Sequence, residues 1–173
     1  MNYREIVNSC YCGNGSLKLE LAERLGKEYG RKLLQHVAIQ AQLTVLKEAV
    51  TALDLHMGAM EMGKTCSHCA AKPDGGCCSA YMGNENNDAL QLLMNILAGV
   101  TVKQVRHDGV ECGFLGETGC LLLFKPIFCL NYLCARIQNE SSVEVLRILE
   151  QKTATLLGAQ VNLEQQLIQF LQK

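Results

Sequence analysis

The sequence contains no tryptophan, only two prolines, and few aromatic side chains of any kind, which make up 5% of its 173 residues. The hydrophobic core must therefore be built from aliphatic and sulfur-containing side chains. The chain also lacks an excess of either charge, because 16 basic and 17 acidic residues leave a formal net charge of −1. Nucleic-acid-binding domains usually carry clustered positive charge, so we do not expect nucleic acid as a partner.

Long apolar runs are also missing. No stretch approaches the roughly 20 apolar residues that a membrane-spanning helix needs, so we expect no membrane partner. The opening residues, Met1–Ile6, lack the apolar run of a signal peptide. These absences predict a cytoplasmic protein, in which thiols stay reduced and disulfide bonds are disfavoured. The length is typical of one domain, which we expect to span residues 1–173.

Cysteine, by contrast, is abundant. The chain has ten cysteines, and eight of them lie in close pairs between residues 66 and 134. Zinc and iron–sulfur centres both bind deprotonated cysteine sulfur and often take their ligands from such pairs. Adjacent cysteines also suit two metal ligands better than a strain-free disulfide. The predicted metal ligands are Cys66, Cys69, Cys77, Cys78, Cys112, Cys120, Cys129 and Cys134.

Two long segments carry apolar residues at alternating steps of three and four, which places them on one face of a helix. We expect the first helix to span residues 32–61 and the second to follow an N-cap at Ser141 or Ser142. The first seam consists of Ile39, Leu43, Leu46, Val50, Leu53, Met57 and Met60. The second seam consists of Leu146, Leu149, Thr153, Leu156, Gln160, Leu163, Leu167 and Phe170. The seams should bury each other as an antiparallel pair, either within one chain or across a homodimer.

The remaining expected elements are short. They are a helix capped by Ser16 that ends around Gly26 to Gly30, a helix over 87–98, a helix over 127–137, and strands over 100–105 and 121–124. The apolar face of the helix over 87–98 consists of Leu90, Leu93, Met94 and Leu97. We therefore predict a mainly α fold, in which long antiparallel helices pack as a bundle around an inserted, loop-rich metal-binding region. The helical scaffold comprises residues 17–63 and 141–171, and the cysteine-cluster region comprises residues 64–137.

The second half of the cysteine-cluster region has a more specific pattern. Cys112-Gly-Phe-Leu is followed by Gly119-Cys120 and then by Lys125-Pro-x2-Cys129-x2-Tyr-x-Cys134. With the preceding Cys-x2-Cys and Cys-Cys pairs, this order resembles the YkgJ-type cysteine-cluster proteins, which are described as zinc- or iron-chelating. Related cysteine patterns occur in flagellin lysine-N-methylases. The resemblance covers residues 66–134 and implies that the eight cysteines are metal ligands. Two departures are the seven-residue gap before Cys77 and Lys125 in place of the usual arginine.

Smaller motifs add little. Residues 58–65 match the P-loop pattern G-x4-G-K-[ST], but a P-loop requires a preceding strand, and here the preceding residues keep helical spacing. His68 lies within the first cysteine pair, where side chains usually point outward, so we do not count it as a ligand. Cys10 and Cys12 stand apart from the cluster and are expected to be free thiols in a mobile terminus. Lys64, Lys72 and Lys125 are close enough in sequence to offset thiolate charge.

The leading hypothesis is a cytoplasmic protein whose cysteine cluster binds zinc or iron, with the metal stabilising the fold. One alternative is an iron–sulfur redox protein or a subunit of an iron–sulfur transferase. A second alternative is a helical dimerisation or interaction protein in which the cysteines only brace the fold. The sequence contains no nucleophile–base pair and no paired carboxylates in a recognisable motif, so it predicts no catalytic residues and leaves enzymatic activity open.

Overall fold

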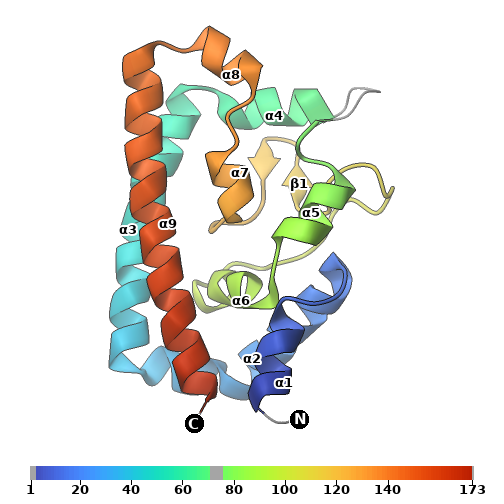
Figure 1. The fold of residues 1–173 in the computed structure, drawn as a ribbon, viewed down its shortest axis with the longest axis vertical. Coiled ribbons are helices and arrows are strands. Elements are labelled where there is room, and N and C mark those ends of the chain that lie inside the picture. Colours follow the sequence, from blue (N-terminus) through green and yellow to red (C-terminus); the bar gives the residue numbers. More distant parts are fainter. Residues whose placement is uncertain (1–2, 71–75, 173) are drawn as a thin grey trace.

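The computed structural model describes residues 3–70 and 76–172, which are mainly helical (Figure 1). This confirms that the fold is mainly α. In chain order the elements are α1 (Tyr3–Cys10), α2 (Gly15–Gln35), α3 (Val37–Ala59), α4 (Met62–Ala70), α5 (Ala80–Asn86), α6 (Ala89–Leu97), β1 (Leu115–Gly116), β2 (Gly119–Cys120), α7 (Ile127–Asn131), α8 (Ala135–Glu140) and α9 (Val143–Leu171). Within these two ranges, none of the helices combines the length and apolar character needed to cross a bilayer.

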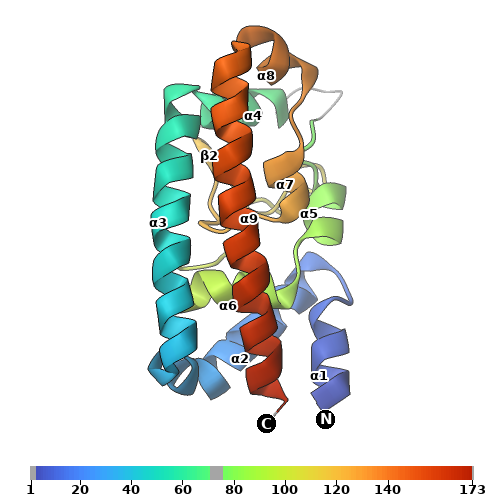
Figure 2. The ribbon, with the colours of Figure 1, turned by 60° about the vertical axis from the view of Figure 1, so that its left-hand side comes forward.

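The two long helices α3 and α9 lie side by side and run in opposite directions (Figures 1 and 2). Their seams bury each other as predicted: Leu46 and Leu156, for example, are both 0% exposed. The Gln42 side chain also donates a hydrogen bond of 3.0 Å to the Ala159 carbonyl, which fixes the relative position of the two helices. The pairing is therefore made within one chain, and a homodimer through the same seams would have to displace it.

The boundaries of the first long helix were predicted wrongly. The segment expected as one helix over 32–61 is divided at His36, where α2 ends and α3 begins. The His36 N–H bonds to the Leu33 carbonyl at 3.1 Å, and the extended backbone of His36 turns the chain. Helix α2 also continues through Gly26, which was expected to lie near the end of the helix. Glycine occurs at this position because the absence of a side chain lets α6 pack closely against α2. A Cβ at Gly26 would lie only 3.2 Å from Ile96.

Helix α6 lies at the centre of the fold and packs against α2 and α9. Most of its side chains are buried, including the predicted Leu90 and Leu93. The helix begins where the Asp88 side chain accepts a hydrogen bond from the Gln91 N–H, and it ends before Gly99, whose φ of 90° suits glycine. The predicted third helix is thus confirmed, with boundaries shifted inward by one or two residues.

The two predicted strands are wrong. Residues 100–105 and 121–124, all of which the structure describes, form no strand. The apolar alternation there reflects packing into the core, where Val102 and Phe124 are buried, without a neighbouring strand to pair with. Instead, β1 and β2 form a two-residue antiparallel hairpin that pairs Leu115 with Cys120.

Candidate metal centre

The structure brings the elements that carry the cysteines together on one side of the α3–α9 pair (Figure 1). Helix α4 packs against β2, and α5 packs against α7. Cys66 and Cys69 lie on α4, Cys77 and Cys78 directly precede α5, Cys112 precedes the hairpin, Cys120 lies on β2, Cys129 lies on α7 and Cys134 is the N-cap of α8. Cysteines that are clustered in sequence thus lie on elements that pack against one another, α4 on β2 and α5 on α7.

Three of these thiols share a hydrogen-bond network. The Cys78 thiol is hydrogen-bonded to the side chains of both Cys66 and Cys77, and this raises the pKa of Cys78 well above its ordinary range. The same contacts lower the pKa of Cys66 and lower that of Cys77 to about 6. The hydrogen bonds from Cys78 therefore favour the thiolate form of its two neighbours, Cys66 and Cys77. The long sequence gap between Cys69 and Cys77 therefore does not keep Cys77 and Cys78 away from Cys66.

A second group of thiols is electrostatically linked to the first. Part of the Cys129 residue is exposed, but burial of its thiol raises its pKa to about 12, and Cys120, Cys112 and Cys77 each add to this rise. Burial also raises the pKa of Cys120, while nearby Lys125 opposes the rise. Of the three lysines expected to offset thiolate charge, Lys125 lies near Cys120 and Cys129, and it also forms an ion pair with Asp54 at 3.2 Å. Lys64 is exposed and paired with Glu61 at 2.7 Å, and Lys72 lies outside the described residues.

Close backbone approaches hold the cysteine-bearing elements together. A side chain at Gly63 on α4 would collide with the Thr118 carbonyl in the hairpin turn. The Ser67 hydroxyl donates to the Gly116 carbonyl at 3.1 Å, which fixes α4 over the hairpin. A Cβ at Gly83 on α5 would lie 2.8 Å from the Cys112 sulfur. These positions need glycine for tertiary packing, a requirement that the sequence alone does not reveal.

Two local expectations about the cysteines change. Cys66 and Cys69 were expected in a loop, but they lie on α4, where a spacing of three keeps both on one helical face. The expected helix over 127–137 is broken after Asn131, and the Tyr132 N–H ends α7 by bonding to the Phe128 carbonyl at 2.9 Å. That break removes the constraint of a regular helix, which would have pointed Cys129 and Cys134 in different directions.

The thiols do not form a preformed ion cage. Within the part of the chain that the structure describes, no three cysteine, histidine, aspartate or glutamate side chains converge as a bound metal ion requires. His68 is exposed, in keeping with the outward position expected for it. Cys10 corrects another expectation, because it is 0% exposed in the hydrophobic core rather than in a mobile terminus, and burial raises its pKa to about 12.

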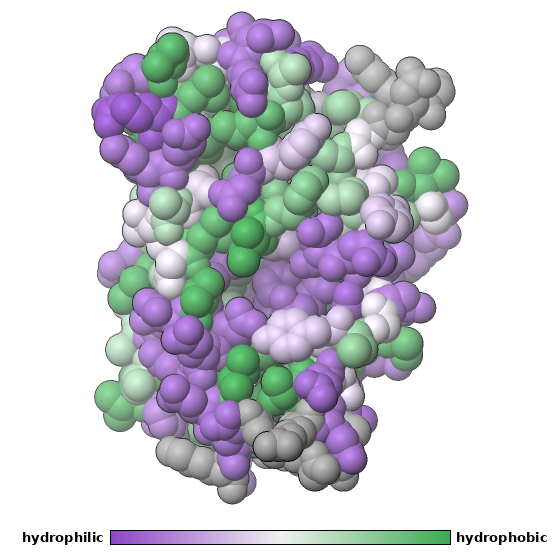
Figure 3. All heavy atoms as spheres, in the orientation of Figure 1, coloured by the Kyte–Doolittle hydropathy of each residue, from purple (hydrophilic) through white to green (hydrophobic). Residues whose placement is uncertain are grey.

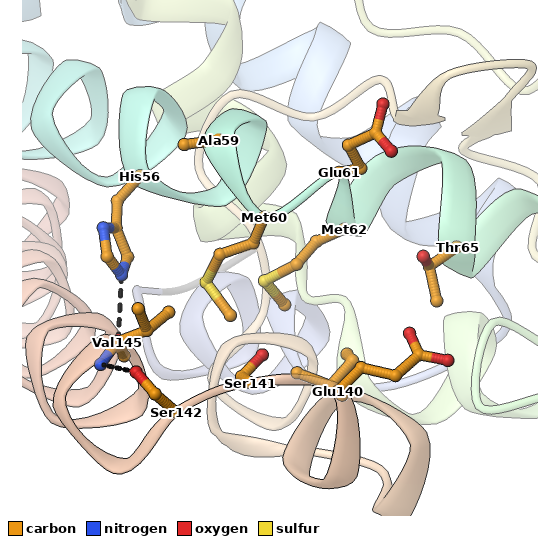
Figure 4. Close-up of a pocket in the computed structure, with 11 residues that line it drawn as sticks. His56, Ala59, Met60, Glu61, Met62, Thr65, Glu140, Ser141, Ser142 and Val145 are labelled. Carbon is orange, nitrogen blue, oxygen red and sulfur yellow. Dashed lines mark hydrogen bonds between the residues drawn. The ribbon is translucent and has the colours of Figure 1, made fainter.

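A pocket of about 400 Å³ lies beside the cysteine-cluster region, between the α3–α4 turn and the α8–α9 turn. The side chains of Met60 and Met62 lie side by side and point into it, and the His56 ring bonds through Nε2 to the Val145 carbonyl at 2.9 Å (Figure 4). The P-loop pattern falls on this turn and follows helix α3 rather than a strand. The local structure is therefore not that of a P-loop.

Comparison of the chain with protein-family models, with curated proteins and with solved structures found no match. The resemblance to YkgJ-type proteins therefore stays a prediction from the cysteine motif. What can be said of this site comes from its own residues.

Proposed function

We propose that this is a cytoplasmic metal-binding protein whose cysteine cluster binds zinc or iron, with the metal stabilising residues 64–137. The observation that carries the proposal is the contact among three thiols, in which the Cys78 side chain is hydrogen-bonded to the side chains of Cys66 and Cys77. A zinc or iron ion bound by these sulfurs would let all three ionise, because metal ligation favours the thiolate.

Further thiols could complete the ligand set. A tetrahedral zinc site or an iron–sulfur cluster takes four thiolates, and the charges of Cys120, Cys112 and Cys77 each raise the pKa of Cys129, which places these thiols near one another. Binding requires the sulfurs to close on the ion, and rotation about the Cα–Cβ bond moves a cysteine sulfur without moving the backbone. Lys125 would offset part of the negative charge of such a centre.

The first test is the metal content of protein purified without oxygen and without a metal-affinity tag. We expect about one or two zinc or iron ions per chain. Zinc without colour would support a structural site. Iron with acid-labile sulfide and broad visible absorption would instead favour the iron–sulfur redox or transferase alternative. Absence of both metals, in protein whose thiols are reduced, would contradict the proposal.

Cysteine variants test whether the metal is bound where we propose. Cys78→Ser and Cys120→Ser should each reduce the metal content and the melting temperature, because structural metal binding is coupled to folding. Cys12→Ser is the matched control, since Cys12 is an exposed thiol outside the cluster. Equal metal content in all three variants would place the metal elsewhere. A strong chelator should also lower the melting temperature of the wild-type protein and change that of Cys78→Ser less.

A further inference from the structure

A second, smaller cavity lies away from the network of Cys66, Cys77 and Cys78, between the start of α6, the start of α7 and the middle of α9. Its volume is about 110 Å³. Five side chains that line it carry carboxylate or amide oxygens, namely Asn86, Asp88, Gln91, Gln160 and Glu164. On the outer surface, apolar side chains gather over α7 and the middle of α9 (Figure 3), and Ile127 and Val161 from these helices also line the cavity.

The two glutamines present acceptor oxygens that have no partner. Gln91 and Gln160 are only 5% and 6% exposed, and neither amide oxygen has a hydrogen-bond partner among the described residues. Their orientation is fixed, because the Gln91 amide nitrogen donates to the Phe124 carbonyl and the Gln160 nitrogen donates to the Lys125 carbonyl. A carbonyl can only accept, so neither amide can be reversed. Both oxygens therefore need a donor or a cation.

The two carboxylates lack a full countercharge. Asp88 accepts hydrogen bonds from the backbone N–H groups of Gln91, at 2.8 Å, and of Leu90, and Glu164 accepts one from the Tyr11 hydroxyl. The Glu164 carboxylate has a second oxygen beyond the one in that bond. Burial and the charge of Glu164 raise the pKa of Asp88 to about 6, and the only described cation that opposes the rise is Lys18. The Lys18 amine, however, donates to the Asn84 carbonyl at 2.6 Å.

We propose that this cavity binds one hard divalent cation of the Ca²⁺ or Mg²⁺ class through Asp88, Glu164, Gln91 and Gln160. Carboxylate and amide oxygens are the ligands that such ions take in proteins, and water molecules complete the coordination shell. The cavity contains no sulfur ligand among its described lining residues, apart from the weak thioether donor of Met94, so it would not compete for the zinc or iron of the cysteine cluster.

The first experiment is isothermal titration of the full chain, as purified, with Ca²⁺, Mg²⁺ and Mn²⁺ separately in chelator-free buffer. We expect one ion per chain. Tight binding of Ca²⁺ with weak binding of Mg²⁺ would identify a flexible, carbonyl-rich calcium site, and the reverse order would identify a magnesium site. No binding of any of the three at millimolar concentrations would overturn the proposal and leave water as the occupant.

Variants locate the ion. Glu164→Gln and Asp88→Asn should each weaken binding by about tenfold or more, because affinity depends on the number of charged ligands. Both changes preserve the side-chain size, and asparagine remains a good helix cap at Asp88. Glu150→Gln is the matched control, since Glu150 is an exposed carboxylate on the same helix α9. Affinity unchanged in both cavity variants would overturn the proposal, and circular dichroism would verify that each variant is folded.

Terbium luminescence provides an independent readout. Tb³⁺ replaces Ca²⁺ at oxygen sites, and a nearby tyrosine transfers excitation to it. The chain has no tryptophan, and Tyr11 contacts Glu164 directly, so Tyr11 should sensitise the bound ion. We expect Tyr11→Phe to remove most of the sensitised emission while calcium affinity changes by less than about threefold. Emission that is unchanged in Tyr11→Phe would place the ion at another tyrosine.

Discussion

Asn95 joins the central helix α6 to the segment that leads into α7, and its replacement by alanine should destabilise the protein strongly. The side chain is 0% exposed. Its nitrogen donates to the carbonyls of Gln91 at 2.9 Å and Phe124 at 3.0 Å, and its oxygen accepts a hydrogen bond of 3.0 Å from the Phe124 N–H. The Asn95 side chain thus hydrogen-bonds to both the N–H and the carbonyl of buried Phe124, as the backbone of a neighbouring β-strand would.

The magnitude follows from which groups lose their partners in Asn95→Ala. The Phe124 carbonyl keeps a donor, because the Gln91 side chain also bonds to it. The Phe124 N–H has no second acceptor among its hydrogen bonds, so it becomes a buried unpaired donor, which costs about 1–3 kcal/mol. Loss of the hydrogen bond from the Asn95 nitrogen to the Phe124 carbonyl adds about 1 kcal/mol. We expect the free energy of unfolding to fall by about 3 kcal/mol, a large part of the 5–15 kcal/mol that is typical of a domain.

Urea denaturation followed by circular dichroism measures the effect. Gln91→Met is the informative comparison, because it removes one of two donors to the Phe124 carbonyl and also removes a buried oxygen that has no partner. We expect it to cost less than about 1 kcal/mol when no divalent cation is added. A loss in Asn95→Ala as small as that in Gln91→Met would refute the reasoning, since it would mean that the Phe124 N–H finds another partner.

Three further predictions concern stability. Leu46→Ala should lower the free energy of unfolding by about 2–5 kcal/mol in urea denaturation, because Leu46 is fully buried between α3 and α9. The control Leu55→Ala, at a 73% exposed position on α3, should change the free energy of unfolding by less than about 0.5 kcal/mol. Ser142→Ala should cost about 1 kcal/mol in the same assay, since the hydroxyl accepts a hydrogen bond of 3.3 Å from the Val145 N–H at the start of α9; no loss would mean that water replaces the cap. Burial raises the pKa of Asp88 from 3.8 to about 6, so the Asp88 carboxyl binds a proton more tightly in the folded protein than in the unfolded chain. The stability that this protonation contributes is complete below about pH 4 and is lost as the pH rises to about 6. Asp88→Asn should therefore flatten the fall in stability between pH 4 and 7 without calcium, and an unchanged pH profile would contradict this assignment.

The helical scaffold could be predicted from the sequence because its signal is periodic and its partner is another helix of the same kind. Each seam residue from Ile39 to Leu53 and from Leu149 to Leu167 is buried in the structure. The N-cap of α9 was also predictable, since Ser142 precedes the first seam residues. The failures lie where tertiary contacts decide. Gly26 was expected to end a helix, and only the approach of α6 shows why it remains inside one.

The cysteine-cluster region shows the same division between local and tertiary information. The close spacing of the eight cysteines predicts that they gather, and in the structure Cys66, Cys77 and Cys78 are in contact. It does not predict that Cys66 on α4 meets Cys78 before α5, since that contact depends on how α4 packs on the hairpin. The second cavity was not predicted at all. Asp88, Gln91, Gln160 and Glu164 come from two helices far apart in sequence, and no short motif connects them.

The two candidate sites are connected by one short segment of backbone. Gln91 and Asn95 on α6 donate to the Phe124 carbonyl, and Gln160 on α9 donates to the next carbonyl, that of Lys125. Helix α7, which carries Cys129, begins two residues later. The scaffold therefore fixes the start of α7 through hydrogen bonds that need no metal.

Helices α4 and α5 lie on either side of the segment that ends in the adjacent cysteines, Cys77 and Cys78. Helix α4 packs on the hairpin and on α3, whereas α5 packs on α7 and on α2, where Lys18 donates to the Asn84 carbonyl. The network between Cys66 and Cys78 joins α4 to the start of α5, so a metal bound there should contribute stability mainly to these two helices. The scaffold helices α3, α6 and α9 already bury their own apolar faces and should remain folded when the metal is removed.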